Sequence, residues 1–180
     1  YEPSEPRPNA VQIITGQKPS NGGPILFGRS PFQAFKYSGG GYVIVQLTLS
    51  DLLGQPFAEL MWKRILAPLG MNNSSFEQPP QASMASRASR AYSSEGKAMG
   101  VPWHVYPEQA AAGLWTTPTD LARFAMEIQS ALQGRKTATL TQQTAREMLF
   151  PTGVGPVGLG PVIESRNGGW YFRHGGANWG

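Results

Sequence analysis

The chain has 180 residues, enough for one domain, and its 14% charged and 40% hydrophobic residues favour a globular protein over disordered, collagen-like or coiled-coil classes. The net charge of +4 comes from scattered Lys and Arg without a basic block, which argues against nucleic-acid binding. The absence of cysteine excludes disulfides, cysteine-ligated metals and thiol nucleophiles.

The first part of the chain, residues 1–36, is rich in proline and is predicted to be a connecting segment. One short helix is predicted within it, over 10–15, where Asn9 can cap the first turn and Gly16 can end the last. The longest clean apolar run of the whole sequence, 42–45, is far too short for a transmembrane helix.

Two helices are predicted after this segment. A flexible turn at 37–41 leads into the first, over about 42–53, whose apolar residues recur with helical spacing. The second begins near Pro56, a residue that suits the first turn of a helix, and is closed by Pro68. The residues that follow, 72–112, are predicted to be irregular, with short strands at most.

The sharpest helix start of the sequence is at Thr117, which can cap a helix whose first residue is Pro118. This helix carries one apolar stripe, which we expect to be core: Leu121, Phe124, Ala125, Ile128 and Leu132. A shorter helix is predicted over 142–149. The sequence then predicts a β-hairpin, with strands over 157–164 and 170–174 around the turn Asn167-Gly168-Gly169.

Several kinds of active site are excluded or disfavoured by the residues present. The two histidines, His104 and His174, form no zinc-binding pattern, and there is neither a Gly-x-Ser-x-Gly elbow nor a phosphate-binding loop. We therefore expect no metal and no cofactor, and we interpret His104 as a packing residue. One Ser-x-x-Lys, at 94–97, contains Gly96 and indicates a turn rather than the helix start that a catalytic pair requires.

Three segments, in this order, resemble one family: Tyr37-Ser38-Gly39-Gly40-Gly41-Tyr42, Gly113–Phe124 and His174-Gly175-Gly176-Ala177. They resemble the second motif, a helix start and the third motif of the serine β-lactamase and penicillin-binding-protein superfamily, which includes class C-like β-lactamases, D-Ala-D-Ala carboxypeptidases and esterases. The resemblance implies an α+β, β-lactamase/transpeptidase-like fold, in which an antiparallel sheet with flanking helices packs on a helical part. We predict a single partial domain over 1–180, with residues 37–150 in the helical part and 151–180 in a hairpin of the sheet.

The resemblance also implies site residues. An active-site serine forms an acyl-enzyme with a β-lactam, an ester or a D-amino-acid peptide, and water then hydrolyses it. Tyr37 is implied to be the general base or proton relay, and His174 to be the basic residue of the third motif. Gly175 and Gly176 would let a peptide-like substrate lie along the strand edge, and the N–H of Ala177 would be one arm of the oxyanion hole.

The sequence departs from the family pattern in two ways. The family's Ser-x-x-Lys is not found upstream of Tyr37, so we interpret the chain as a C-terminal fragment that lacks the nucleophile and the final strands and is inactive alone. Gly39 stands where the family often has Asn, which argues against efficient β-lactam hydrolysis. The alternative is a non-catalytic binding protein on the same scaffold. We expect a periplasmic or secreted bacterial location, and apolar surface that pairs with a second chain.

Overall fold

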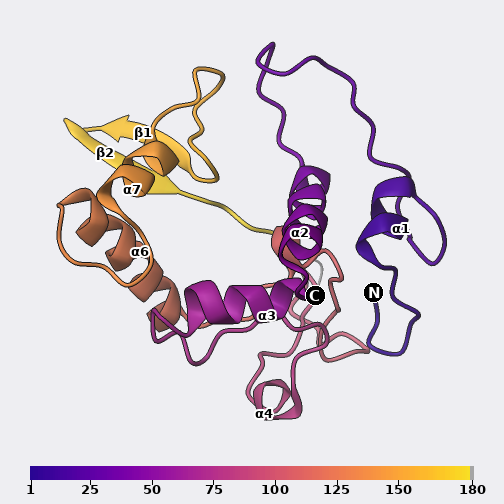
Figure 1. The fold of residues 1–180 in the computed structure, drawn as a ribbon. Coiled ribbons are helices and arrows are strands. Elements are labelled where there is room, and N and C mark those ends of the chain that lie inside the picture. The colour runs from indigo at the N-terminus through magenta and orange to yellow at the C-terminus, as the bar shows by residue number, and fades with distance from the viewer. Residues whose placement is uncertain (179–180) are drawn as a thin grey trace.

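The computed structural model describes residues 1–178, which form an arc of helices with a β-hairpin at one end (Figure 1). The last two residues of the predicted hairpin part, Trp179 and Gly180, lie outside the described residues. In chain order the elements are α1 (Ala10–Thr15), α2 (Gly39–Leu53), α3 (Phe57–Met61), the π-helical turn η1 (Trp62–Leu66), α4 (Ala82–Ala85), α5 (Gln109–Ala112), α6 (Pro118–Leu132), α7 (Gln142–Leu149), β1 (Val162–Arg166) and β2 (Gly169–Arg173). None of the helices in this described part is long and apolar enough to cross a bilayer.

The start of α2 corrects the sequence analysis. The predicted turn at 37–41 is wrong in part, because Gly39, Gly40 and Gly41 form the first turn of the helix. Ser38 caps it, and its Oγ accepts the N–H of Gly41 at 3.1 Å. The cap satisfies one of the free N–H groups of the first turn, which offsets the poor helix propensity of glycine.

The predicted helices with clear caps are confirmed. Asn9 accepts the N–H of Gln12 at the start of α1, which ends at Gly16. Thr117 caps α6 through its hydroxyl, as predicted, and Thr141 caps α7, which covers the predicted residues 142–149. The second predicted helix is α3 continued by η1, with Pro56 just before the first residue instead of within the first turn.

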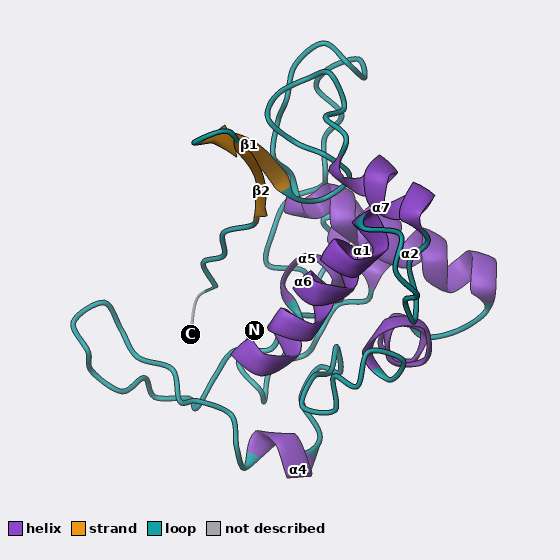
Figure 2. Cartoon of the chain, turned by 90° about the vertical axis from the view of Figure 1, so that its left-hand side faces the viewer, coloured by secondary structure: helices purple, strands orange, loops and turns teal. Residues whose placement is uncertain are grey.

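Two predictions about the second half of the chain are wrong in detail. The region 72–112 contains two single-turn helices, α4 and α5, where none was predicted. The hairpin is antiparallel, with Val162 opposite Arg173 and Arg166 opposite Gly169, but its first strand begins five residues later than predicted. Gly160, with a φ of +119°, and Pro161 interrupt the extended backbone before β1. Figure 2 shows the hairpin at one edge of the molecule.

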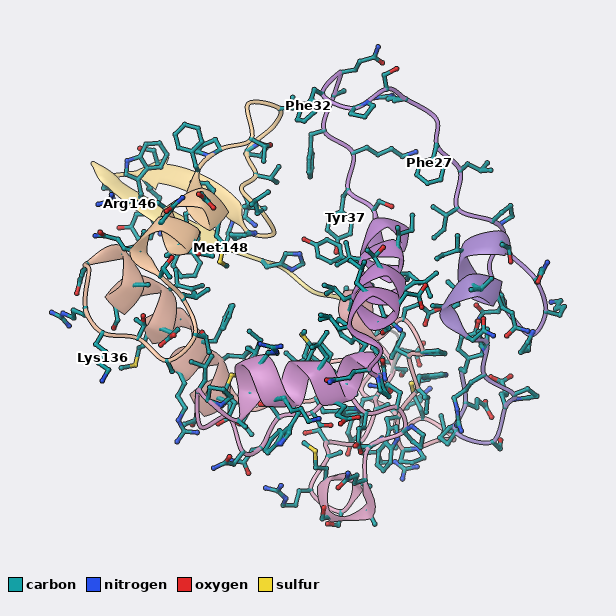
Figure 3. All side chains as sticks on the ribbon, in the orientation of Figure 1. Phe27, Phe32, Tyr37, Lys136, Arg146 and Met148 are labelled. Carbon is teal, nitrogen blue, oxygen red and sulfur yellow. The ribbon has the colours of Figure 1, made fainter. Side chains whose placement is uncertain are left out.

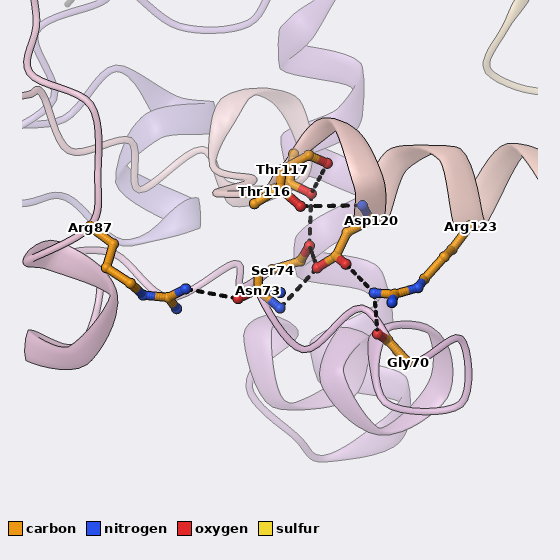
Figure 4. A network of polar contacts seen from close by, with 8 residues as sticks. All are labelled: Gly70, Asn73, Ser74, Arg87, Thr116, Thr117, Asp120 and Arg123. Atoms are coloured by element: carbon orange, nitrogen blue, oxygen red, sulfur yellow. Dashed lines mark hydrogen bonds and ion pairs between the residues drawn. The ribbon is translucent and has the colours of Figure 1, made fainter.

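The helical part is held together by an apolar core and one buried polar network. Val43, Leu66, Val105 and Ile128 are at most 2% exposed. Asp120, in the first turn of α6, is fully buried and accepts hydrogen bonds from the backbone N–H of Asn73 at 2.8 Å and the hydroxyl of Ser74 at 2.9 Å (Figure 4). Its other oxygen pairs with Arg123, which also donates to the carbonyl of Gly70. The network fixes the start of α6 on the loop that follows η1.

Candidate functional site

A cavity of about 500 Å³ lies between the start of α2, α5, α6, α7 and the hairpin. Its wall is mostly apolar, with Leu121, Phe124, Met148 and Phe172 among the lining residues. Tyr37 and Met148 point into this space from opposite sides (Figure 3). Leu121 lines the cavity and is 46% exposed, so the prediction that the whole apolar stripe of α6 is core is wrong at this residue.

Tyr37 and His174 lie side by side at this cavity. Their ring centroids are 6.0 Å apart, with the ring planes at 46°. Tyr37 directly precedes the cap of α2, and His174 directly follows the last residue of β2. Both side chains are accessible, Tyr37 being 65% exposed, so a substrate can reach either of them. The structure thus brings together two residues that the sequence analysis placed in one site from separate segments.

The three residues after His174 do not lie on a strand, which corrects the expected strand edge. β2 ends at Arg173, because its partner β1 begins opposite it and offers no further pairing. Gly175 and Gly176 are exposed, with nothing within 4 Å of the place a Cβ would take. Ala177 is exposed as well. This segment runs back from the hairpin to the helical part, where Asn178 donates to the carbonyl of Ala112 at 3.1 Å.

Gly39 is the first residue of α2, two positions from Tyr37. A Cβ placed on it would meet only the Cβ of Ala111, at 3.8 Å, which is ordinary van der Waals contact. There is therefore room for a larger side chain. Because Gly39 has no side chain, this end of the site lacks the side-chain amide that the family often has here.

Several residues of the cavity wall were missed by the sequence analysis. Ala110 and Ala111, in α5, line the cavity beside Tyr37, and no pattern in the sequence singled them out. Arg173 also lines it and donates to Glu164 of β1 at 2.7 Å. That hydrogen bond lowers the pKa of the partly exposed Glu164 carboxyl and raises the pKa of Arg173. Glu164 and Arg173 are diagonal neighbours on the two strands of the hairpin. The sequence could have indicated this pair, because the Asn-Gly turn sets which residues of the two strands face each other.

The remaining sequence candidates lie elsewhere. His104 does not line this cavity, and its neighbour Trp103 packs edge-on against Trp115 with ring centroids 5.9 Å apart. The Ser-x-x-Lys at 94–97 is in a turn, as predicted, with Gly96 at a φ of +75° and Lys97 paired to Glu95. Within residues 1–178, no group of three or more His, Cys, Asp or Glu side chains could hold a metal ion.

Comparison with known proteins gives a consistent result. The model of the family described as Beta-lactamase matches residues 24–180. No curated protein matches the chain. Among solved structures, the D-amino acid amidase from Ochrobactrum anthropi SV3 is similar at 25% identity, with a TM-score of 0.60, over 81% of this chain and 43% of the amidase.

Two more distant structures show the same fold. The D-stereospecific amidohydrolase from a Streptomyces species is similar at 23% identity, with a TM-score of 0.63, over 84% of this chain and 46% of that one. The penicillin-binding protein from Bacillus halodurans is similar at 14% identity, with a TM-score of 0.66, over 90% and 48%. The chain therefore spans less than half the length of each of these three structures.

Proposed function

The chain belongs to the β-lactamase family and has its α+β, β-lactamase/transpeptidase-like fold, and on this premise we propose that the whole protein is a serine hydrolase working through an acyl-enzyme. The observation that carries the proposal is the placement of Tyr37 beside His174 at one accessible cavity. We further propose that the nucleophile is the serine of a Ser-x-x-Lys outside residues 1–180. This chain covers less than half of each of the two similar amide-hydrolysing structures, which leaves room for such a motif in the rest of the protein.

The proposed reaction has two steps. The serine Oγ attacks the substrate carbonyl carbon, and Tyr37 takes the hydroxyl proton and passes it to the leaving group as the bond to that group breaks. Water then attacks the acyl carbon, the bond between this carbon and the serine Oγ breaks, the carboxylic acid leaves, and a proton from the water restores the serine hydroxyl. Tyr37 directly precedes the cap of α2, so it stands at the end of the helix where the backbone N–H groups carry partial positive charge. His174 is the basic group facing it.

We propose D-amino-acid amides or peptides, or esters, as substrates in preference to β-lactams. Two considerations support this choice. The similar structure at 25% identity is named a D-amino acid amidase. Gly39 provides no side-chain amide beside Tyr37, so a substrate that depends on such a contact loses it.

We also propose that exposed apolar side chains of this chain pack against another apolar surface. That surface belongs either to the rest of the same protein or to a second copy of it. Large apolar side chains stand out into solvent, with Phe27 at 85% and Phe32 at 80% exposure (Figure 3), and Trp170 at 74%. Surfaces of this kind mark association sites. Gel filtration of residues 1–180 at monomer size, without aggregation, would count against this.

The function is tested by kinetics of the whole protein on D-amino-acid amides and simple esters. Tyr37→Phe removes the proton relay and should lower kcat/KM by roughly a hundredfold or more, the usual size of a general acid–base contribution. Tyr92→Phe is the matched control, because Tyr92 is exposed and lies away from the cavity. Equal activity of the two variants would contradict the proposed role of Tyr37. No turnover of any such substrate by the wild-type protein would favour the non-catalytic alternative.

A further inference from the structure

One short segment of the helical part, residues 106–113, touches the elements that carry both proposed site residues. Its helix α5 has four residues, too few to be stable by its own hydrogen bonds. Ala110 and Ala111 of this helix line the cavity with Tyr37 and His174. What holds this segment in place therefore bears on the geometry of the site.

Gln46 is the first side chain that holds the segment. It lies in α2, is 8% exposed, and makes two hydrogen bonds with the backbone of the segment. Its Nε2 donates to the carbonyl of Pro107 at 3.0 Å, and its Oε1 accepts the N–H of Ala110 at 3.0 Å. One amide thus satisfies a donor and an acceptor that α5 itself leaves unpaired.

Gln78 holds the two ends of the same segment. Its Oε1 accepts the N–H of Tyr106 at 3.1 Å, and its Nε2 donates to the carbonyl of Gly113 at 2.7 Å. Gly113 is itself tightly packed, because a Cβ there would stand 2.6 Å from the Cα of Gln109. The segment is therefore fixed at its ends by one glutamine and near its middle by another.

The third amide links the segment to His174. Asn178, four residues after His174, donates to the carbonyl of Ala112. The returning tail after β2 is visible in Figure 1. Tyr37 is connected to the segment through α2 and Gln46, and His174 is connected to it through Asn178.

We propose that Gln46 and Gln78 are positioning residues, which hold residues 106–113 so that Tyr37 and His174 stay side by side. The expected effect on catalysis rests on the proposed function. The expected effect on the placement of Tyr37 and His174 does not. Neither glutamine lines the cavity that contains Tyr37 and His174. Each acts through the backbone of the segment, so its loss should alter the site while leaving the reacting groups in the chain.

The test uses the whole protein with Gln46→Met and Gln78→Met, which keep most of the side-chain volume and remove both hydrogen bonds. Gln142→Met is the matched control, because the Nε2 of Gln142 also donates to a backbone carbonyl, that of Leu132, far from the segment. The first readout is the ring-proton NMR resonance of His174, one of only two histidines in residues 1–180. His174→Ala assigns this resonance in the whole protein, because the signal disappears in that variant, and the readout needs no turnover.

We expect both test variants to shift the His174 resonance, because the ring leaves its place beside Tyr37, and to speed amide hydrogen exchange at 106–113. We also expect kcat to fall roughly tenfold to a hundredfold with a displaced pH–rate profile, as for small misplacements of catalytic groups. Gln142→Met should do none of this. An unchanged His174 resonance in either folded variant, or unchanged kcat and pH profile where the wild type turns over, would overturn the inference. Absence of turnover in the wild type would contradict the proposed function instead. The His174 resonance would then still test whether the two glutamines keep His174 beside Tyr37.

Discussion

Removal of the buried carboxylate of Asp120 should weaken the fold more than any other single change to a charged side chain among residues 1–178. In Asp120→Ala, the backbone N–H of Asn73 and the hydroxyl of Ser74 lose their acceptor in a site that water does not reach. Hydrogen bonds to a charged group contribute about 1.5–3 kcal/mol each, so the two together amount to roughly 3–6 kcal/mol. The Arg123 side chain is 46% exposed and can hydrate, so its pairing adds little.

The assay is urea unfolding of the whole protein, followed by tryptophan fluorescence. Asp120→Asn keeps one carbonyl acceptor in place and should cost about half as much. Glu59→Ala, which removes an ion pair whose two side chains are about half exposed, should change the free energy of unfolding by less than about 0.5 kcal/mol. A loss below about 1 kcal/mol in Asp120→Ala would refute the view that this network holds α6 on the preceding loop.

Three further outcomes are expected. Gly39→Asn fits beside Ala111 and should raise the rate of acylation by a β-lactam without harming the fold, measured with a chromogenic cephalosporin; no gain would argue against the role given to this position. Phe32→Gly should raise stability by up to about 1 kcal/mol in urea, because Phe32 is held at a φ of +65° while its ring is 80% exposed. Burial by itself would raise the pKa of Glu127. The hydrogen bonds from Thr139 and from the backbone N–H of Leu140 have the larger combined effect and hold the pKa below its ordinary value of 4.5. The stability that Glu127 provides is therefore present above pH 4.5 and lost as pH falls through its lowered pKa, and Glu127→Gln should flatten that acid limb of a melting-temperature profile.

The elements that could be predicted from the sequence are those with local signals. Thr117, Thr141 and Asn9 each accept a backbone N–H from within their own helix, so a few neighbouring residues determine where the helix starts. The start of α2 was predicted too late, because glycine propensity outweighed the cap at Ser38 in the interpretation. α5 could not be predicted, since the side chains that satisfy its backbone come from residues such as Gln46, far away in the chain.

The candidate site divides in the same way. Tyr37 and His174 were singled out by short segments that resemble family motifs, and the structure brings the two rings together. Their catalytic roles stay predictions. The cavity wall, with Ala110, Ala111 and the half-exposed Leu121, depends on how α5 and α6 meet the hairpin. Such contacts between distant segments leave no periodic signal in the sequence.

The most direct test of the proposed acyl-enzyme is to treat the whole protein with a serine-reactive fluorophosphonate and to find the modified residue by mass spectrometry. We predict one adduct per chain, on a serine outside residues 1–180 that is followed three positions later by lysine. Tyr37→Phe should slow its formation by roughly a hundredfold. No adduct, or an adduct on Ser94 in the exposed turn at 94–97, would contradict the account.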